Sequence, residues 1–342
     1  MDGADGTVRV ARGVVHMARK TDSSARRRGR RIAQTRHGSL RYPPVACAAA
    51  EYHAMTIETL VRLVVLLSEM LIVFGVALRS SWSDATSLFR KPTLLLRALL
   101  SMNVLLPLFA ASTAAVLDLP RAIEILLVAL AVSPVPPKLP GRQLQLVTHP
   151  AYVFGLLGTT SLLAIVLAPL TMAVIGLMFS RRMDVSAWVV ARMVTLTVLL
   201  PFSLGIIVRR CASRFAERAS LVAGKLGVLL LVIAALPVLM AVWSDMIALI
   251  GDGTILAIVV FTVVGLAVGH LLGGPDPDNR TALALATASR HPGVALAIAA
   301  SSFPGEKLVE PAMILYVAIS LVVSRPYIVW RRRLHNRLVS AA

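Results

Sequence analysis

The sequence predicts an all-α membrane protein with about ten transmembrane helices, and three observations lead to this fold class. Of the 342 residues, 57% are hydrophobic and only 15% are charged, whereas a soluble domain has about 45–50% and about 25%. The mean hydropathy is +0.78. The apolar residues come in blocks of roughly 20, about the length that a helix needs to span the hydrocarbon. Transmembrane β-barrels instead show short alternating segments.

The strongly basic composition fits a membrane protein. The net charge is +18, and the cations gather at helix ends, in loops and in the first 54 residues. This distribution is typical of topology control and of contact with anionic membrane lipid, so we expect no nucleic-acid partner. Two cysteines, Cys47 and Cys211, cannot form a disulfide framework, and we interpret both as free thiols. The sequence holds no metal-ligand spacing, phosphate loop or nucleophile motif, so we predict neither enzymatic activity nor a cofactor.

Residues 1–54 are polar and basic and include the arginine-rich run at 26–31. No apolar region follows within the distance expected for a secretory signal. Two interpretations stay open, a disordered basic arm and an over-long gene model whose synthesis really starts at Met55. We assign this segment no function.

Ten helices are expected after this segment. Their approximate bounds are 57–78, 93–116, 121–136, 139–149, 150–178, 186–208, 220–243, 254–272, 279–302 and 308–330. The fourth is too polar to face lipid and fits a short broken helix enclosed by protein. We expect two inverted five-helix repeats, 55–178 and 179–331, and a cytoplasmic tail at 332–342.

Positive charge predicts the orientation. The most basic loop holds Arg209, Arg210, Arg214, Arg218 and Lys225, and the tail holds Arg331, Arg332, Arg333 and Arg337. Both are typical of cytoplasmic segments. Ten spans then place both termini in the cytoplasm of a multi-pass protein in a bacterial-type inner (plasma) membrane. Two basic loops, 90–91 and 181–182, fit this topology badly because both would lie outside.

Two apolar segments are broken by proline, one in each half. The first break holds Pro134, Pro136, Pro137 and Pro140 with Lys138 among them, and the second holds Arg290, His291, Pro292 and Gly293. Proline lacks an amide hydrogen, and glycine tolerates unusual backbone angles. A cation at such a break is costly unless it faces protein or water. Paired breaks are typical of secondary transporters built from inverted repeats.

Several of these segments together resemble the bile acid:sodium symporter family. They are Arg90-Lys91-Pro92 followed by a helix with Asn103 and Pro107, then Ser133-Pro134, the stretch 152–170, and the block 289–297. The resemblance covers about 57–330. It implies a panel domain of the first, second, sixth and seventh helices and a core domain of the others. It also implies that the fourth and ninth helices are broken and cross near the membrane centre, with the substrate beside them.

The resemblance implies a sodium site that this sequence does not keep. Where sodium-coupled members carry oxygen ligands, an ungapped alignment places Leu139, Pro140, Val153, Leu157 and Ala286. Arg290-His291 stands where those members have a Gln-Asn pair. Sodium needs oxygen ligands, and arginine offers only donors. We therefore hypothesise that Arg290, with or without Lys138, supplies as a fixed charge what bound sodium supplies in relatives.

Each residue at the breaks has two interpretations. Arg290 is either a cation facing the core or a helix-end residue that snorkels to water. His291 is either a proton carrier or a neutral imidazole hydrogen-bonded at the break. Lys138 belongs to the first break or reaches water from a loop. Asn103 either touches the substrate or makes an interhelical hydrogen bond.

Arg62 and Glu69 lie seven residues apart and share one helix face. They either form an ion pair that helps helices to pack or point into the cleft between domains.

The predicted function is secondary transport of a small organic anion by alternating access, with the anion and membrane lipid as partners and the coupling ion undetermined. Two alternatives stay open. One is a membrane sensor or receptor domain on a transporter fold. The other is a sodium-coupled symporter that uses other ligands.

Overall fold

The computed structural model describes residues 45–136, 146–147, 150–178 and 186–341, and every regular element in these ranges is helical. The chain divides into two units, Met1–Thr59 and Leu60–Ala342. The described part of the first unit, 45–59, is helical. All contacts discussed below lie within the second unit.

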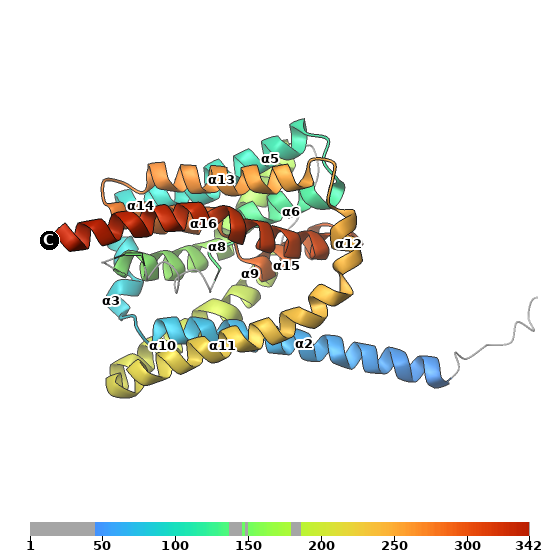
Figure 1. Cartoon of the computed structure of the whole chain (residues 1–342), viewed down its shortest axis with the longest axis horizontal. Helices are drawn as coiled ribbons and strands as arrows, with labels where there is room; N and C mark the ends of the chain where they lie inside the picture. The colour runs from blue at the N-terminus through green and yellow to red at the C-terminus, as the bar shows by residue number, and fades with distance from the viewer. Residues whose placement is uncertain (1–44, 137–145, 148–149, 179–185, 342) are drawn as a thin grey trace, which may run out of the picture. The chain divides into compact units, whose positions relative to one another are not determined.

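The helices follow one another closely along the chain (Figure 1). In order they are α2 (Val45–Ala77), α3 (Trp82–Ala85), the 3₁₀ turn η1 (Ser87–Arg90), α4 (Pro92–Leu99), the π-helix η2 (Leu100–Leu105), α5 (Leu106–Val116), α6 (Arg121–Val132), α8 (Ala151–Met178), α9 (Ala187–Val194), the π-helix η3 (Thr195–Leu199), α10 (Leu200–Cys211), α11 (Ser213–Ala241), α12 (Trp243–Ala248), α13 (Thr254–Leu272), α14 (Pro277–Ala288), α15 (Pro292–Ser302) and α16 (Val309–Ala341).

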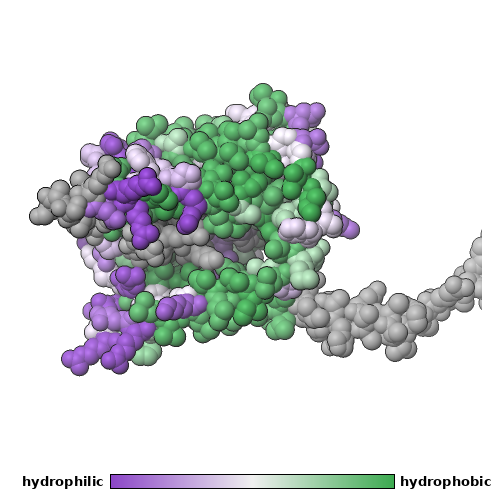
Figure 2. All heavy atoms as spheres, in the orientation of Figure 1, coloured by the Kyte–Doolittle hydropathy of each residue, from purple (hydrophilic) through white to green (hydrophobic). Residues whose placement is uncertain are grey.

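Within these described ranges, seven helices are long and apolar enough to cross a membrane. They are Thr59–Ala77, Pro92–Val116, Ala151–Leu177, Ala187–Cys211, Ser213–Ala241, Thr254–Leu272 and Val309–Leu334. Apolar residues cover the middle of the face shown in Figure 2, and polar residues gather toward its two ends. The predicted class, a polytopic all-α membrane protein, is confirmed.

Three further helices are too short to span the hydrocarbon alone. α6 and α14 have 12 residues each and α15 has 11. Twelve residues rise about 18 Å, compared with about 30 Å of hydrocarbon. α14 and α15 are the two halves of one broken segment, as the sequence predicts for 279–302.

The expected third helix, 121–136, ends earlier than predicted. α6 stops at Val132, and Ser133 is extended, with φ −72° and ψ 153°. The reason is Pro134, which disfavours a helical conformation for the residue before it. The expected fourth helix, 139–149, lies mostly outside the described residues.

Three helices, α2, α10 and α11, pack together through glycines, and we call them the panel. A Cβ on Gly75 of α2 would lie 2.9 Å from the backbone nitrogen of Gly224 in α11. A Cβ on Gly205 of α10 would lie 2.5 Å from the Cβ of Ala77. Small residues permit this close approach of backbones, which is a common way for membrane helices to associate.

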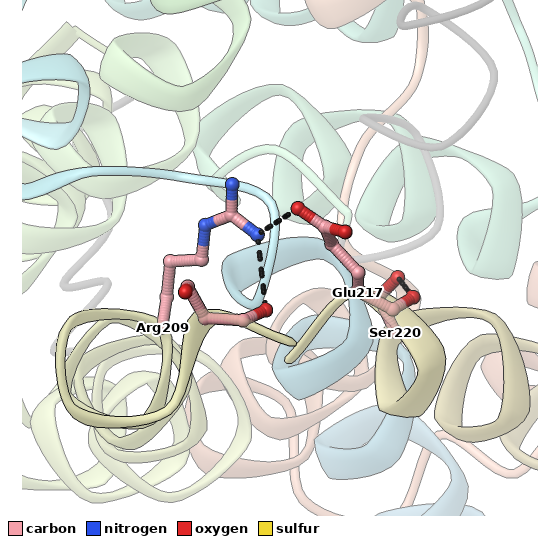
Figure 3. Close-up of polar contacts among 4 residues, drawn as sticks. Arg209, Glu217 and Ser220 are labelled. Carbon is pink, nitrogen blue, oxygen red and sulfur yellow. Dashed lines mark hydrogen bonds and ion pairs between the residues drawn. The ribbon is translucent and has the colours of Figure 1, made fainter. Parts of the chain in front are cut away.

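A polar corner joins α10 to α11 (Figure 3). Arg209 Nη1 lies 3.2 Å from Glu217 Oε1 and 3.5 Å from the carbonyl oxygen of Ser213. The Ser220 hydroxyl donates to the Glu217 carbonyl at 2.9 Å. Because Arg209 and Glu217 are both exposed to solvent, this ion pair contributes at most about 1 kcal/mol.

A second group, which we call the core, contains α4 to α6, α8 and α13 to α16. α13 and α14 pack most closely, through Gly265, Gly269 and Gly273 at four-residue spacing. A Cβ on Gly269 would lie 2.5 Å from the carbonyl oxygen of Leu283. α9 leaves the panel and packs on α8 and α15.

The segment 92–116 belongs to the core, since α5 packs on α6 and α13. The expectation that this second helix lies in the panel is wrong. The reason is the short connection at 117–120, which returns the chain directly into α6 and makes the two helices neighbours.

One end of the bundle collects basic loops. A Cβ on Gly274, after α13, would lie 3.0 Å from Arg97 Nη1 of α4. Arg331 of α16 donates to the carbonyl of Pro277 at 2.7 Å. The start of α4, the α13–α14 loop and the late part of α16 therefore lie at the same end, which we call the basic end.

The opposite end carries mostly carboxylates. The connections 117–120, 242–253 and 303–308 and their neighbours lie there, and they include Asp118, Glu124, Asp245, Asp252, Glu306 and Glu310. We call it the acidic end. Arg121 and Phe303, from two of these connections, are in contact, with the guanidinium carbon 5.4 Å from the ring centroid.

The first and last spans have their outer ends on opposite sides. α2 leads into the basic end at Ala77, so Leu60 lies toward the acidic end, whereas Arg331 lies at the basic end. The expectation that both lie on one side is wrong. The reason is that Arg121 lies at the acidic end and Ala151 at the basic end, whereas the predicted third and fourth helices would return the chain to the acidic end. A Cβ on Gly155 near the start of α8 would indeed lie 2.6 Å from the Ser87 hydroxyl.

Candidate functional site

A π-helix in the segment 92–116 leaves one carbonyl without a helical partner. The amide of Leu106 donates to Ser101 and not to Met102, four residues earlier. The next residue is Pro107, which has no amide hydrogen. The Met102 carbonyl is therefore available to a donor from another helix. Single π-turns of this kind occur frequently at functional sites.

The two breaks meet in the core. α6 and α14 each end at an extended serine, Ser133 and Ser289. The backbone amide of His291 donates to the carbonyl of Pro134 at 2.9 Å, a hydrogen bond that joins one break to the other. α15 packs against α6. The first residues of the two breaks therefore lie side by side, and we call this place the crossing.

Arg290 is buried at the crossing, with only 2% of its surface exposed. Its Nε donates to the carbonyl of Leu130 at 3.2 Å, and its Nη2 donates to the carbonyls of Ala131 and Met102. Leu130 and Ala131 belong to the last turn of α6, where carbonyls run short of donors. The Leu130 carbonyl also accepts the amide and the hydroxyl of Ser133, at 3.0 and 2.9 Å. The cation therefore neutralises the negative end of the α6 dipole.

Tyr316 of α16 completes the surroundings of the arginine. Its hydroxyl donates to the carbonyl of Ala288 at 2.9 Å and accepts the backbone amide of Arg290 at 3.3 Å. Its ring packs edge-on against Phe261 of α13, with centroids 6.1 Å apart. Tyr316 thus ties the end of α14 to two other core helices.

His291 is the N-cap of α15. Its Nδ1 accepts the amide of Val294 at 3.4 Å, so this nitrogen carries no proton and the neutral ring carries its hydrogen on Nε2. Pro292 takes the first helical position, where its missing amide hydrogen costs nothing. Gly293 has an ordinary helical backbone, and a Cβ there would lie 3.4 Å from the His291 ring, an ordinary contact.

Two buried donors at the crossing have no acceptor among the described residues. They are Arg290 Nη1 and His291 Nε2. α15 also directs its N-terminal, positive dipole end toward this place. The crossing therefore has an excess of hydrogen-bond donors and positive charge, which favours an anionic or otherwise oxygen-rich ligand.

The remaining predicted site residues are less informative. Pro137, Lys138 and Pro140 lie outside the described residues. Asn103 is half-buried in η2, next to Met102, and its predicted substrate contact stays a prediction. Glu124 pairs with Arg121 at 2.9 Å at the start of α6.

Sequence reasoning missed three polar residues of the core. They are Tyr316, Ser101 and Thr287, and the last two share a buried hydrogen bond of 2.7 Å between η2 and α14. The available signal was a hydroxyl in a mostly apolar segment, one of several hydroxyls in each such segment. That signal does not identify a partner 186 positions away along the chain.

The described residues at the implied sodium positions do not fit a metal ion. Val153, Leu157 and Ala286 are all buried and belong to one hydrophobic cluster. No group of three or more histidine, cysteine, aspartate or glutamate residues within the described ranges could hold a metal. These side chains offer a sodium ion no oxygen ligand.

Half-helices that meet inside an all-α membrane protein are typical of membrane transporters. A sequence model of the sodium bile acid symporter family matches residues 64–249, more than half of the 342 residues. The chain belongs to this family of membrane transporters. No curated protein matches the sequence. The family match ends before α14, so the resemblance of the second break rests on its own residues.

Proposed function

We propose that this chain is a secondary transporter that moves a small organic anion by alternating access between the panel and the core. The observation that carries this proposal is the crossing, where the Arg290 guanidinium donates hydrogen bonds to carbonyls at the C-terminal end of α6. In this proposal Arg290 replaces a bound sodium ion as the cation that stabilises the crossing. Transport is then independent of sodium.

The preference for an anion is supported by the polar groups at the crossing. Arg290 and the N-terminus of α15 are positive, and His291 adds a buried donor. A carboxylate, sulfate or phosphonate group offers the acceptors that these donors lack.

Uptake into proteoliposomes tests this function. The purified protein is supplied with a panel of radiolabelled organic anions, namely a bile acid, a steroid sulfate, a keto acid and a hydroxy acid, while sodium, potassium and pH gradients are varied independently. We expect uptake of at least one anion above empty liposomes, unchanged when potassium replaces sodium. A steep dependence on sodium would contradict the fixed-cation proposal, and no uptake of any compound under any gradient would contradict transport of organic anions.

A further inference from the structure

Glu69 is a carboxylate in the middle of a membrane span. It is the one acidic residue in the apolar stretch Thr59–Ala77 of α2. Its side chain is half-buried. The ion pairs in the described part of the chain join Arg121 to Glu124 and Arg209 to Glu217, and Glu69 takes part in neither. A carboxylate at this depth is costly and calls for a functional explanation.

The face of α2 that carries Glu69 looks away from lipid. Leu60, Leu63 and Leu67 are 61%, 57% and 50% exposed and share the opposite face. Val73 and Val76 lie one and two turns beyond Glu69 on its own face, and both are buried.

The two valines show what this face meets. They belong to the buried cluster that also contains Met102 of η2, Val135 of the first break and Leu157 of α8. The face of Glu69 is therefore directed at the core, and α2 closes against the core at the level of Val73 and Val76. Toward Leu60 the same face of α2 is accessible to solvent, as the exposed Arg62 side chain shows. Glu69 lies at the boundary between the closed and open parts.

The neighbouring panel helices bring little charge to Glu69. α11 faces α2 through Gly227, whose Cβ would lie 2.9 Å from the Ser68 carbonyl, and α11 has no charged residue from Gly227 to Ala241. Its nearest charge, Lys225, is exposed. α10 has none from Leu200 to Val208.

Further charged and titratable groups lie on α2, on α9 and in the core, where Tyr152 of α8 belongs to the same buried cluster as Val73 and Val76. Arg62 shares the face of Glu69 on α2 itself. α9 carries Arg192, which is exposed. The core contributes Arg290 and His291, both buried at the crossing.

We propose that Glu69 is the proton-binding site that couples transport to the proton gradient. This inference rests on the proposed transport function. With the cleft open at the acidic end, the Glu69 carboxylate takes up a proton and becomes neutral. When panel and core close around it, only the neutral form avoids the cost of an unpaired charge in apolar surroundings. The proton is released when the cleft opens at the basic end.

In this scheme Glu69 supplies a charge that changes with pH, which the crossing lacks. Arg290 is permanently charged, so its charge does not change with the ion content on either side. Glu69 does respond to the two solutions. One proton accompanying one monovalent anion makes the cycle electroneutral. A pH difference of one unit then supports up to about tenfold accumulation of the anion.

Infrared difference spectroscopy of the protein in liposomes tests the site without any substrate. We expect the carbonyl-stretch band of a protonated carboxylic acid, whose intensity falls as the bulk pH is raised, and its loss in Glu69→Gln. The matched control is Glu217→Gln, the same substitution at an exposed panel carboxylate, which should leave the band unchanged. A band that persists in Glu69→Gln, or its absence from the unaltered protein, would overturn the proposal.

Transport then tests the coupling, with an anion found in the uptake panel. Glu69→Gln should lose accumulation driven by a pH gradient, down to the ratio of one reached without a gradient, and should retain exchange of labelled for unlabelled anion. Glu69→Asp should retain some accumulation. Gradient-driven accumulation equal to that of the unaltered protein in Glu69→Gln would refute Glu69 as the coupling site. If no anion is exchanged at all, the transport proposal fails, while the infrared result still decides whether Glu69 binds a proton.

Discussion

At the scale of single residues, the crossing depends on one cation that serves three carbonyls. Met102 lacks a helical partner because of Pro107, and Ala131 lacks one because α6 ends, while the Leu130 carbonyl also accepts from Ser133. Arg290 supplies donors in a planar fork, which a lysine could not reproduce. The charge is thereby partly offset by oriented backbone dipoles, while Nη1 stays without an acceptor among the described residues.

Replacing Arg290 by Gln should destabilise the protein. The substitution leaves buried carbonyls without donors, at a cost of about 3 kcal/mol. We expect a clear decrease in the thermal midpoint of the detergent-solubilised protein, and a smaller decrease for Arg290→Lys, which keeps the charge. The control is Arg325→Gln on the exposed face of α16. Equal midpoints for Arg290→Gln and the control would mean that the hydrogen bonds of Arg290 contribute nothing to stability.

At the scale of helices, close packing at glycines holds two groups of helices together. One group contains α2, α10 and α11, and the other contains α13 and α14. Helices whose backbones are this close interlock along the contact, so one helix does not slide easily past the other. The panel and the core should therefore each move as a unit, with the change in geometry confined to the elements between them. η3 is one such element, because α9 packs on the core while α10 packs on the panel.

Gly269 and Gly224 provide a matched pair of glycine-to-alanine substitutions within helices. A methyl group on Gly269 would overlap the backbone of α14, with the Leu283 oxygen only 2.5 Å away, so Gly269→Ala should cost about 1–3 kcal/mol. A methyl group on Gly224 meets nothing within 4 Å, so Gly224→Ala should be neutral or stabilise by up to about 1 kcal/mol. Thermal unfolding checks the order, and a more stable Gly269→Ala would contradict the close packing.

At the scale of the whole chain, the arrangement of charge assigns the two sides. The basic end carries the connections with Arg90 and Lys91 and with Arg209 and Arg210, together with the late part of α16. The positive-inside rule predicts that this end faces the cytoplasm. The Arg90-Lys91 connection, which fits badly in a ten-span topology, is then on the expected side.

Cysteine labelling distinguishes the two topologies. In a Cys47→Ala background, Cys211 and a cysteine from Ser83→Cys should react with a membrane-impermeant maleimide from the cytoplasmic side. A cysteine from Asp118→Cys should react from the outside. All three native residues are exposed. Labelling of Ser83→Cys from the outside would restore the ten-span arrangement and contradict the placement of Arg121 and Ala151 at opposite ends.

Much of the fold and part of the site follow from the sequence. Apolar blocks of membrane length predict the long helices, and Pro134 and Pro292 predict the breaks, because a residue without an amide hydrogen acts locally. For Arg290 the sequence leaves two interpretations open, a cation that faces the core and one that snorkels to water, and only the structure shows that the side chain is buried.

The rest depends on contacts that no local pattern encodes. The sequence does not show that Arg121 and Ala151 lie at opposite ends of the bundle, because a half-helix such as α6 and a short full helix have the same apolar composition. It does not identify Met102, whose relevant atom is a backbone carbonyl common to all residues. Tyr316 is equally hidden, since its partners come from residues 26 and 28 positions away on other helices.

The order in which the chain is synthesised suits its buried cation. The acceptors of Arg290 precede it by 159 to 188 residues, so the ribosome has already delivered η2 and α6 to the bilayer when the arginine leaves the exit tunnel. The guanidinium can exchange water for waiting carbonyls without a long stay in hydrocarbon. A crossing that relied on a bound metal ion would be completed only after insertion, by an ion taken from solution. Arg290 is part of the chain, so its cation is present at insertion.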